Sequence, residues 1–364
     1  MTIDLNHLTL EDAAQALRTR ALSPVELTDA VLARCDAVES TIGAFVEVLH
    51  DRARAAAKAA EADVARGAYR GPLHGIPVGV KDLFDMTGLP TTSSSQVRQD
   101  FLPTGNARCV ELLEQAGAVI IGKTHTHEFA DGVVTPTTRN PWDTGRIPGG
   151  SSGGTGAAVA AGEVLMGLGT DTGGSIRIPS SLCGLAGIKP TYGRVSRFGV
   201  TSLSWSLDHA GPMARTVRDV AISLRLLAGY DRRDPATVDV TVPDYLEGIE
   251  AGVSGLRIGV PRNHYVDPCA PAVASSLEKV VDELQAEGAR VVPVTVPLDH
   301  LYGPLLFTIL LPEASAYHQA MLRGRPDRYG EDVRQYLEAG ELVLGTDYVK
   351  ALRLRSLMQQ AWKA

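Results

Sequence analysis

Residues 147–190 read IPGGSSGGTGAAVAAGEVLMGLGTDTGGSIRIPSSLCGLAGIKP. This stretch holds two runs of small residues, GGSSGG at 149–154 and TDTGGS at 170–175, separated by a short apolar segment. Glycine loses more conformational entropy on folding than any other residue, so this density of glycine is costly. A flexible linker is the plain alternative, but linkers do not alternate with apolar runs such as VLMGL. The stretch therefore predicts backbone that is held close to a ligand.

The rest of the chain predicts helices alternating with short apolar strands. Three helices open the chain, the first capped by Thr9, the second by Ser23, and the third covering 51–66. A turn rich in Gly and Pro then leads into the strand 78–81. Such alternation is typical of an α/β protein with a buried, largely parallel sheet. Further segments continue the pattern of a helix followed by an apolar strand: 106–117 with 118–121, a helix and strand together within 157–168, 216–229 with 256–260, and 270–288 with 291–296. The end of the chain, 301–364, is predicted to be helical, with breaks near 324–330 and 340–345.

Composition narrows the class of protein. The chain has 364 residues, of which 44% are hydrophobic and 21% charged, as in ordinary globular proteins. A net charge of −7 without a basic run argues against nucleic acid and anionic membranes as partners. The four cysteines are widely spaced and include no CxxC pair, which favours reduced thiols. The acidic N-terminus does not resemble a signal peptide, so we expect a soluble cytoplasmic protein.

Two known motifs, one for phosphate binding and one for a serine nucleophile, match this sequence only in their residue spacing. GAVIIGKT at 117–124 has the spacing of a phosphate-binding P-loop, but its four middle residues are apolar and predict a strand instead of a loop. Gly149-x-Ser151-x-Gly153 has the spacing of the nucleophile elbow of α/β-hydrolases. That elbow follows a strand, whereas the residues before 149 predict a loop, and the neighbours Asp208 and His209 are awkwardly placed for a relay.

Three further candidates have simpler explanations. Ser276-x-x-Lys279 lies in a charged helix and predicts a solvated face. His125, His127 and Glu128 are possible metal ligands, but no partner pair lies at a suitable spacing, so loop residues are the favoured interpretation. Cys183 is a candidate nucleophile, but we interpret it as a small buried residue.

One constellation explains more than these motifs. Lys81 ends a strand after a Gly/Pro turn, Ser151 lies in the first glycine run, and Ser175 is the last residue of the second run. A lysine that is buried at a strand end loses its proton more easily, because burial disfavours the charged form. It can then act as the base for a serine nucleophile, with a second serine relaying the proton. The run 172–175 offers consecutive backbone N–H groups, which suits an oxyanion hole.

These residues resemble the amidase signature family. The resemblance rests on Lys81, GGSSGG, DTGGSIRIP at 171–179, GKT at 122–124, TRNPW at 138–142 and CGLAGIKPTYGR at 183–194. It runs from about residue 71 to 229 and more weakly to both ends. It implies a central mixed, largely parallel twisted sheet with helices on both faces. We expect a single domain over 1–364, with N-terminal helices to residue 70, a signature core over 71–229 and a C-terminal part over 230–364.

The resemblance also implies a mechanism. Family members hydrolyse amides through an acyl-enzyme with a Ser–cis-Ser–Lys triad and without metal or cofactor. Matched residue by residue, Ser175 is the expected nucleophile, Ser151 the cis-serine relay and Lys81 the base. The expected oxyanion donors are the backbone N–H groups of Thr172, Gly173, Gly174 and Ser175. The residues expected to hold the two loops together are Ser152, Asp171 and Arg177.

Two alternatives to a stand-alone amidase stay open at this point. One is the glutaminase subunit of the tRNA-dependent amidotransferase, although His125, Thr126 and His127 stand where that subunit is expected to carry Asn-Met-Asp. The other is a truncated, non-catalytic homologue, because family members run about a hundred residues longer and the sheet would lack its C-terminal strand. We expect a small-molecule amide, carbamate or urea as substrate. A homodimer is the oligomeric state that we consider.

Overall fold

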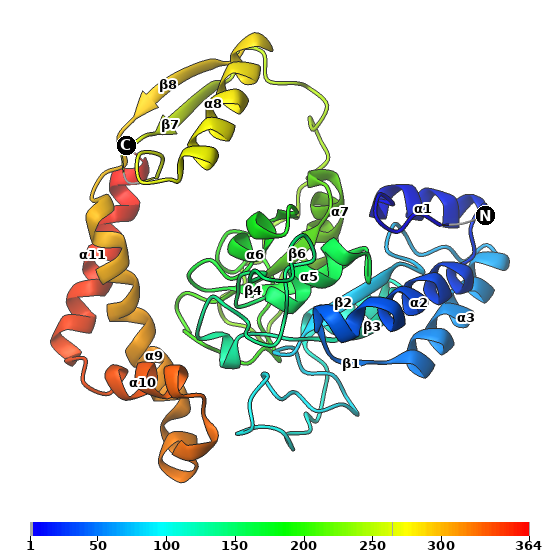
Figure 1. The fold of residues 1–364 in the computed structure, drawn as a ribbon, viewed down its shortest axis with the longest axis horizontal. Helices are drawn as coiled ribbons and strands as arrows, with labels where there is room; N and C mark the ends of the chain where they lie inside the picture. The colour runs from blue at the N-terminus through cyan, green and yellow to red at the C-terminus, as the bar shows by residue number, and fades with distance from the viewer. Residues whose placement is uncertain (1–2, 264, 364) are drawn as a thin grey trace. The chain divides into compact units, whose positions relative to one another are not determined.

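The structure is a computed structural model that describes residues 3–263 and 265–363. The described residues form two compact units (Figure 1). The first unit contains the chain up to Leu246 together with Glu313–Glu338, and the second contains Glu247–Pro312 and the chain from Ala339 onward. The single domain expected from the sequence stays a prediction.

Three helices open the first unit, as the sequence predicts: α1 (Leu10–Thr19), α2 (Pro24–Ile42) and α3 (His50–Ala65). The Thr9 hydroxyl accepts a hydrogen bond from the backbone N–H of Asp12. Ser23 and Glu26 form a reciprocal capping box, with Pro24 at the first helical position. These bonds satisfy backbone N–H groups that a helix leaves unpaired at its start.

The core of the first unit is a six-stranded sheet with the strand order β1–β3–β2–β4–β6–β5. Its central strands β3, β2 and β4 pair in parallel, while β1 lies antiparallel to β3, and β6 lies antiparallel to β4 and β5. Every residue of β2, β3 and β4 is buried, which explains their continuous apolar runs. The predicted mixed α/β class is confirmed. The strands are β1 (Phe45–Val48), β2 (Pro77–Lys81), β3 (Val119–Thr124), β4 (Met166–Asp171), β5 (Ala186–Gly187) and β6 (His209–Ala214).

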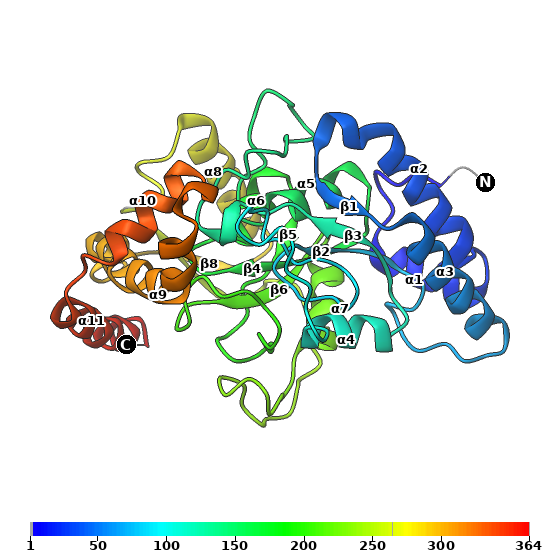
Figure 2. The ribbon, with the colours of Figure 1, turned by 90° about the horizontal axis from the view of Figure 1, so that it is seen from below.

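Helices cover both faces of this sheet. Figure 2 shows α5 (Gly153–Ala161) and α6 (Arg177–Leu182) on one face, and α4 (Arg108–Gln115) and α7 (Val217–Leu227) on the other. Helix α5 contains only Gly, Ala, Thr and Val, and it packs against β2, β3, β4 and β6. A Cβ atom on Gly154 would lie 2.4 Å from the backbone oxygen of Ala44, so only glycine allows this close approach. The glycine run thus seats the start of α5 against the strands.

The second unit is built on a parallel strand pair, β7 (Arg257–Pro261) and β8 (Arg290–Val294), joined by α8 (Pro271–Ala286). The predicted helical end is confirmed, with breaks close to the predicted positions. Its first helix, α9 (Tyr302–Gly324), begins in the second unit and belongs to the first unit from Glu313 onward. None of the described helices has the length and hydrophobicity required to cross a lipid bilayer. The remaining helices are α9 (Tyr302–Gly324), α10 (Glu331–Gly340) and α11 (Gly345–Lys363), with short 3₁₀ turns at Glu128–Ala130, Asp299–Leu301 and Pro326–Arg328.

Candidate active site

Lys81, the last residue of β2, carries its amino group into a fully buried cluster of hydroxyls. Its Nζ atom lies 2.8 Å from Ser151 Oγ, 2.9 Å from Ser152 Oγ and 2.8 Å from Thr170 Oγ1. Burial lowers the pKa of Lys81 well below its ordinary value, although the charges of Asp171 and Asp208 oppose this shift. A neutral lysine is therefore favoured here, and its lone pair can accept a proton.

The hydroxyl partners of Lys81 have different roles. Ser152 donates its own proton to the backbone oxygen of Thr170 at 3.1 Å, so its hydroxyl can only accept from Lys81. A neutral lysine donates two hydrogen bonds and accepts one. The lone pair is therefore left for Ser151 or for the side chain of Thr170. Ser151 is the one of these two that lies in the glycine run, outside the strands.

The two glycine runs are joined through their backbones. The peptide bond between Gly150 and Ser151 is cis, as the resemblance implies. The N–H group of Ser152 donates to the backbone oxygen of Ser175 at 3.1 Å. Among the described residues, no hydrogen bond connects the side-chain hydroxyls of Ser151 and Ser175. The structure thus brings Lys81, Ser151 and Ser152 into direct contact and sets Ser175 beside them.

The loop that follows β4 presents unpaired backbone donors. Within the described part of the chain, the N–H groups of Gly173, Gly174 and Ser175 donate to no other group. Gly174 has φ +143°, and a Cβ atom there would lie 2.7 Å from Ile178 Cδ1. Consecutive N–H groups of this kind, unobstructed by side chains, can stabilise a negative oxygen.

Asp171 fixes this loop to the start of α6. One carboxylate oxygen accepts from the backbone N–H groups of Ile176 and Arg177 and from Arg177 Nε, and the other lies 2.8 Å from Arg177 Nη2. Burial raises the pKa of Asp171, but the hydrogen bonds and charge of Arg177 outweigh burial and hold it below its ordinary value. The carboxylate stays ionised and keeps the loop in place.

Two residues of this site were missed by the sequence analysis. Thr170 is the third contact of Lys81, and its place in the TDTGGS run is a signal that could have found it. Asp208 accepts from the Thr172 hydroxyl at 2.6 Å and also from Ser202 and the backbone of Ser204. It therefore orders the loop from the far side. No local pattern in the sequence points to this role.

Comparison with known proteins gives the family. The family model described as Amidase matches residues 26–364.

The chain belongs to the Amidase family.

Relatives of this amidase agree with that assignment. It is 54% identical over 358 residues to "Amidase" of Pseudomonas putida, in a match that covers 98% of this chain and 76% of that one. It is 44% identical over 375 residues to a glutamyl-tRNA(Gln) amidotransferase subunit of Roseiflexus sp. (strain RS-1), covering 97% of this chain and 77% of the relative. A solved amidase superposes with a TM-score of 0.87 at 35% identity, over 98% of this chain and 79% of the other. The protein is thus a hydrolase of amide C–N bonds.

The three candidate metal ligands have other partners in this amidase. His125 Nδ1 lies 3.1 Å from Ser94 Oγ, and Glu128 accepts from the backbone N–H of Gly330 at 2.7 Å. The residues that the structure describes include no group of three or more His, Cys, Asp or Glu side chains placed to hold a metal ion. His127 has a different role.

His127 supports the cis-serine. Its backbone N–H donates to the Ser151 backbone oxygen at 3.0 Å. Its Nδ1 atom accepts from the N–H groups of Val134 and Thr135 at 3.4 and 3.3 Å, so Nδ1 carries no proton. The proton is therefore on Nε2, which lies 3.0 Å from a carboxylate oxygen of Asp332. These contacts place the ring and the loop that carries Ser151 in one fixed arrangement.

The other sequence motifs serve the scaffold of the amidase. Lys123, from the P-loop-like match, lies in β3 and forms a buried ion pair with Asp82 at 3.0 Å. His209 lies in β6, with Nδ1 2.6 Å from the backbone oxygen of Leu207. Burial raises the pKa of the Cys183 thiol to about 12, so this cysteine is not a thiolate at neutral pH.

Proposed function

We propose that Lys81, Ser151 and Ser175 form a Ser–cis-Ser–Lys triad that hydrolyses a carboxamide, or a related carbamate or urea, through an acyl-enzyme. The observation that carries the proposal is the buried Lys81 Nζ atom, 2.8 Å from the hydroxyl oxygen of Ser151. Serine needs a base to become a nucleophile, and a lysine kept neutral by burial is such a base. Thr172, Gly173 and Gly174 are proposed to bind the substrate oxygen, and Ser152, Asp171 and Arg177 to support the two loops.

Acylation starts with two coupled proton transfers. The lone pair of Lys81 Nζ takes the proton of Ser151, while Ser151 Oγ takes the proton of Ser175. Ser175 Oγ then attacks the amide carbon, and the carbonyl π electrons move onto oxygen. The backbone N–H groups of Thr172, Gly173, Gly174 and Ser175 stabilise this oxyanion. Catalytic hydrogen bonds often tighten only when substrate is bound, which is compatible with separate Ser151 and Ser175 hydroxyls in the structure.

The intermediate then collapses and the C–N bond breaks. The leaving nitrogen takes a proton that returns from Lys81 through Ser151, so ammonia or an amine departs. Water attacks the resulting Ser175 ester, and Lys81 again takes the proton through Ser151. Breakdown of the second intermediate returns the proton to Ser175 Oγ and releases a carboxylic acid. Protons and electrons balance without a metal or an organic cofactor.

The test is the Ser175→Ala variant. We expect it to abolish amide turnover and also covalent labelling by a serine-directed sulfonyl fluoride, followed by intact mass. Ser276→Ala, which alters an exposed serine of α8, is the matched control and is expected to keep both. Full amide hydrolysis by Ser175→Ala would refute the proposed triad.

A glutaminase that works within an amidotransferase complex is the second candidate, because the Roseiflexus relative at 44% identity is named as a component of such an enzyme. We favour stand-alone hydrolysis, since His125, Thr126 and His127 depart from the Asn-Met-Asp expected of that component. Ammonia release from simple amides by the purified chain would support this preference. Glutaminase activity seen only in the presence of further amidotransferase components would reverse it. A small-molecule amide substrate, a homodimer and a cytoplasmic location remain part of the proposal.

A further inference from the structure

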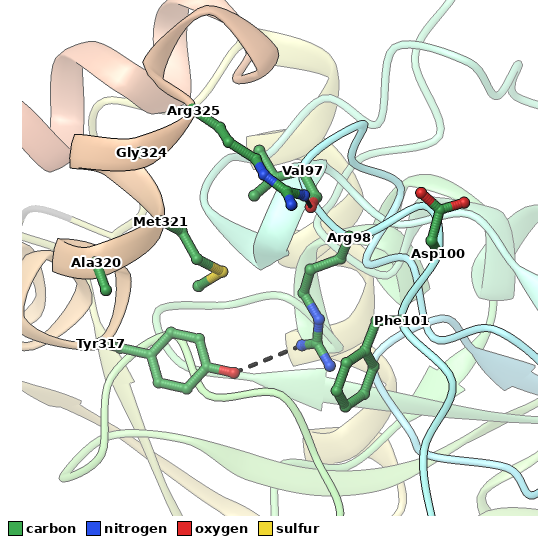
Figure 3. Close-up of a pocket in the computed structure, with 9 residues that line it drawn as sticks. All are labelled: Val97, Arg98, Asp100, Phe101, Tyr317, Ala320, Met321, Gly324 and Arg325. Atoms are coloured by element: carbon green, nitrogen blue, oxygen red, sulfur yellow. Dashed lines mark hydrogen bonds between the residues drawn. The ribbon is translucent and has the colours of Figure 1, made fainter.

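A groove with a volume of about 640 Å³ lies in the first unit between the segment around Val97–Phe101 and helix α9 (Figure 3). Its size falls in the range of small-molecule sites, about 300–1,000 Å³. Nothing in the triad chemistry above uses it. We call it the guanidinium groove; it is lined by Val97, Arg98, Asp100, Phe101, Tyr317, Ala320, Met321, Gly324 and Arg325.

Two guanidinium groups face this groove without forming an ion pair. Arg98 Nη1 donates to Thr201 Oγ1 at 2.7 Å and lies 3.5 Å from the Tyr317 hydroxyl. Arg325 Nη1 donates to the backbone oxygen of Val97 at 3.3 Å. Within residues 3–263 and 265–363, neither arginine forms an ion pair with a carboxylate. A guanidinium has five N–H donors, so most donors of each group remain available to a ligand.

The remaining walls favour an apolar body. The Arg98 guanidinium stacks on the Phe101 ring with its central carbon 3.9 Å from the ring centroid. Phe101 and Tyr317 are 41% and 43% exposed, which is high for aromatic residues on one groove. Figure 3 shows the Asp100 carboxylate directed away from the Arg98 guanidinium, with the Met321 side chain on the opposite wall. The groove thus offers positive charge beside aromatic and thioether surface.

Arg98 connects the guanidinium groove to the active site. Its partner Thr201 is buried and lines a second, small cavity together with Thr170 and Thr172. Thr170 contacts Lys81, and Thr172 opens the loop that carries Ser175. Thr201 therefore contacts a guanidinium of the groove and also lines the cavity that contains Thr170 and Thr172.

We propose that the guanidinium groove binds the negatively charged part of the substrate, so that the preferred substrates are amides bearing a carboxylate on an aryl or alkyl body. This inference rests on the proposed function of Ser175, because it assigns the amide end of the same molecule to that residue. A carboxylate matches the two-donor fork of a guanidinium, and a carbon chain or ring fits against Phe101, Tyr317 and Met321.

The experiment compares matched substrate pairs. One set is a series of ω-carboxyalkanamides against methyl-terminated alkanamides of equal chain length, which allows for the unknown span between groove and Ser175. The other pair is 4-carboxybenzamide against 4-methylbenzamide. We expect the ratio of kcat/KM for acidic over neutral substrate to exceed one, and to fall about tenfold in Arg98→Gln and in Arg325→Gln, because each change removes one charge-assisted contact. The exposed Arg328→Gln variant is the matched control and should keep the wild-type ratio.

A binding measurement separates this inference from the proposed function. Isothermal titration of 4-carboxybenzamide and 4-methylbenzamide into Ser175→Ala tests the groove without turnover. Tighter binding of the acid, lost in the double variants Ser175→Ala/Arg98→Gln and Ser175→Ala/Arg325→Gln, supports the groove even if the triad proposal fails. Equal binding of the two ligands, or an acid preference that survives both arginine changes, overturns it. Arg325 is exposed, so its replacement tests the groove without disturbing the core.

Discussion

Lys81 Nζ and Ser151 Oγ lie 2.8 Å apart in a fully buried setting, the lysine at the end of a strand and the serine in a glycine run. The pairing is unusual because, among the residues that the structure describes, no carboxylate contacts Nζ, so only hydroxyls and more distant charges compensate an ammonium for its lost hydration. Its neighbours are three hydroxyls that can serve either protonation state. This environment supports the proposed role of Lys81 as a base.

Replacement of Lys81 by alanine should remove most catalysis without unfolding the protein. General base catalysis contributes about 10²–10⁴-fold, so kcat/KM for an amide should fall by that order. The measurement is steady-state ammonia release beside a thermal melt, with Lys58→Ala on the exposed face of α3 as the matched control. A Lys81→Ala enzyme with wild-type kcat/KM would show that another group is the base.

Activity should increase with pH through the pKa of Lys81. Because burial lowers this pKa, the neutral base is present well below the pH at which an exposed lysine deprotonates. Protonation at lower pH removes the lone pair that accepts the Ser151 proton, so kcat/KM should fall on the acid side. A pH–rate profile of the free enzyme checks this. An acid limb at the ordinary pKa of lysine would contradict the assignment.

His127 and Asp332 should act on turnover by positioning the cis-serine. We expect Asp332→Ala to lower kcat about tenfold with little change in KM, because the His127 ring loses the acceptor for its Nε2 proton. Asp332→Asn keeps an acceptor oxygen and should restore most of the activity. Equal losses in both variants would argue for a charge effect instead.

The same pair predicts a second, weaker acid effect. Burial lowers the pKa of His127, so its ring is neutral at ordinary pH. Protonation on Nδ1 would place a proton against the N–H groups of Val134 and Thr135, which now donate to that atom. Acid should therefore loosen the loop that carries Ser151. We expect kcat to fall in acid, and we expect this fall to be smaller in the His127→Gln variant.

Thiol reagents should leave the enzyme active. Burial raises the pKa of Cys35, Cys109 and Cys183, and all three lie inside the protein. Cys269 is only partly buried and should be the residue that iodoacetamide labels first. Peptide mapping after labelling, with parallel activity assays, measures both outcomes. Inactivation that follows labelling of Cys183 would revive its role as nucleophile.

Local signals carried most of the prediction. Capping residues marked the first two helices, and continuous apolar runs marked β2, β3 and the helix–strand pair that contains β4, because buried parallel strands have no polar face. The density of glycine marked the two loops that carry Ser151 and Ser175. Strands β5 and β6 escaped detection because β5 has only two residues and β6 contains both Gly and Pro.

Contacts between distant parts of the chain were not predictable in this way. Asp332 pairs with His127 across 205 positions, and Arg98 meets Tyr317 across 219. No periodicity or motif announces such pairs, since they depend on where α9 and α10 pack. The guanidinium groove could not be predicted from the sequence either, because its two walls come from segments that are far apart in the chain and share no motif.

The contact between His127 and Asp332 has a consequence for the newly made protein. Asp332 belongs to Glu313–Glu338, which rejoins the first unit only after the whole of Glu247–Pro312. A ribosome has therefore finished Lys81, Ser151 and Ser175 long before it makes the segment that steadies the loop of Ser151. A nascent chain holds the reactive groups early but gains their final support late. Full hydrolytic power should thus arise only after Glu313–Glu338 has emerged and packed onto the first unit.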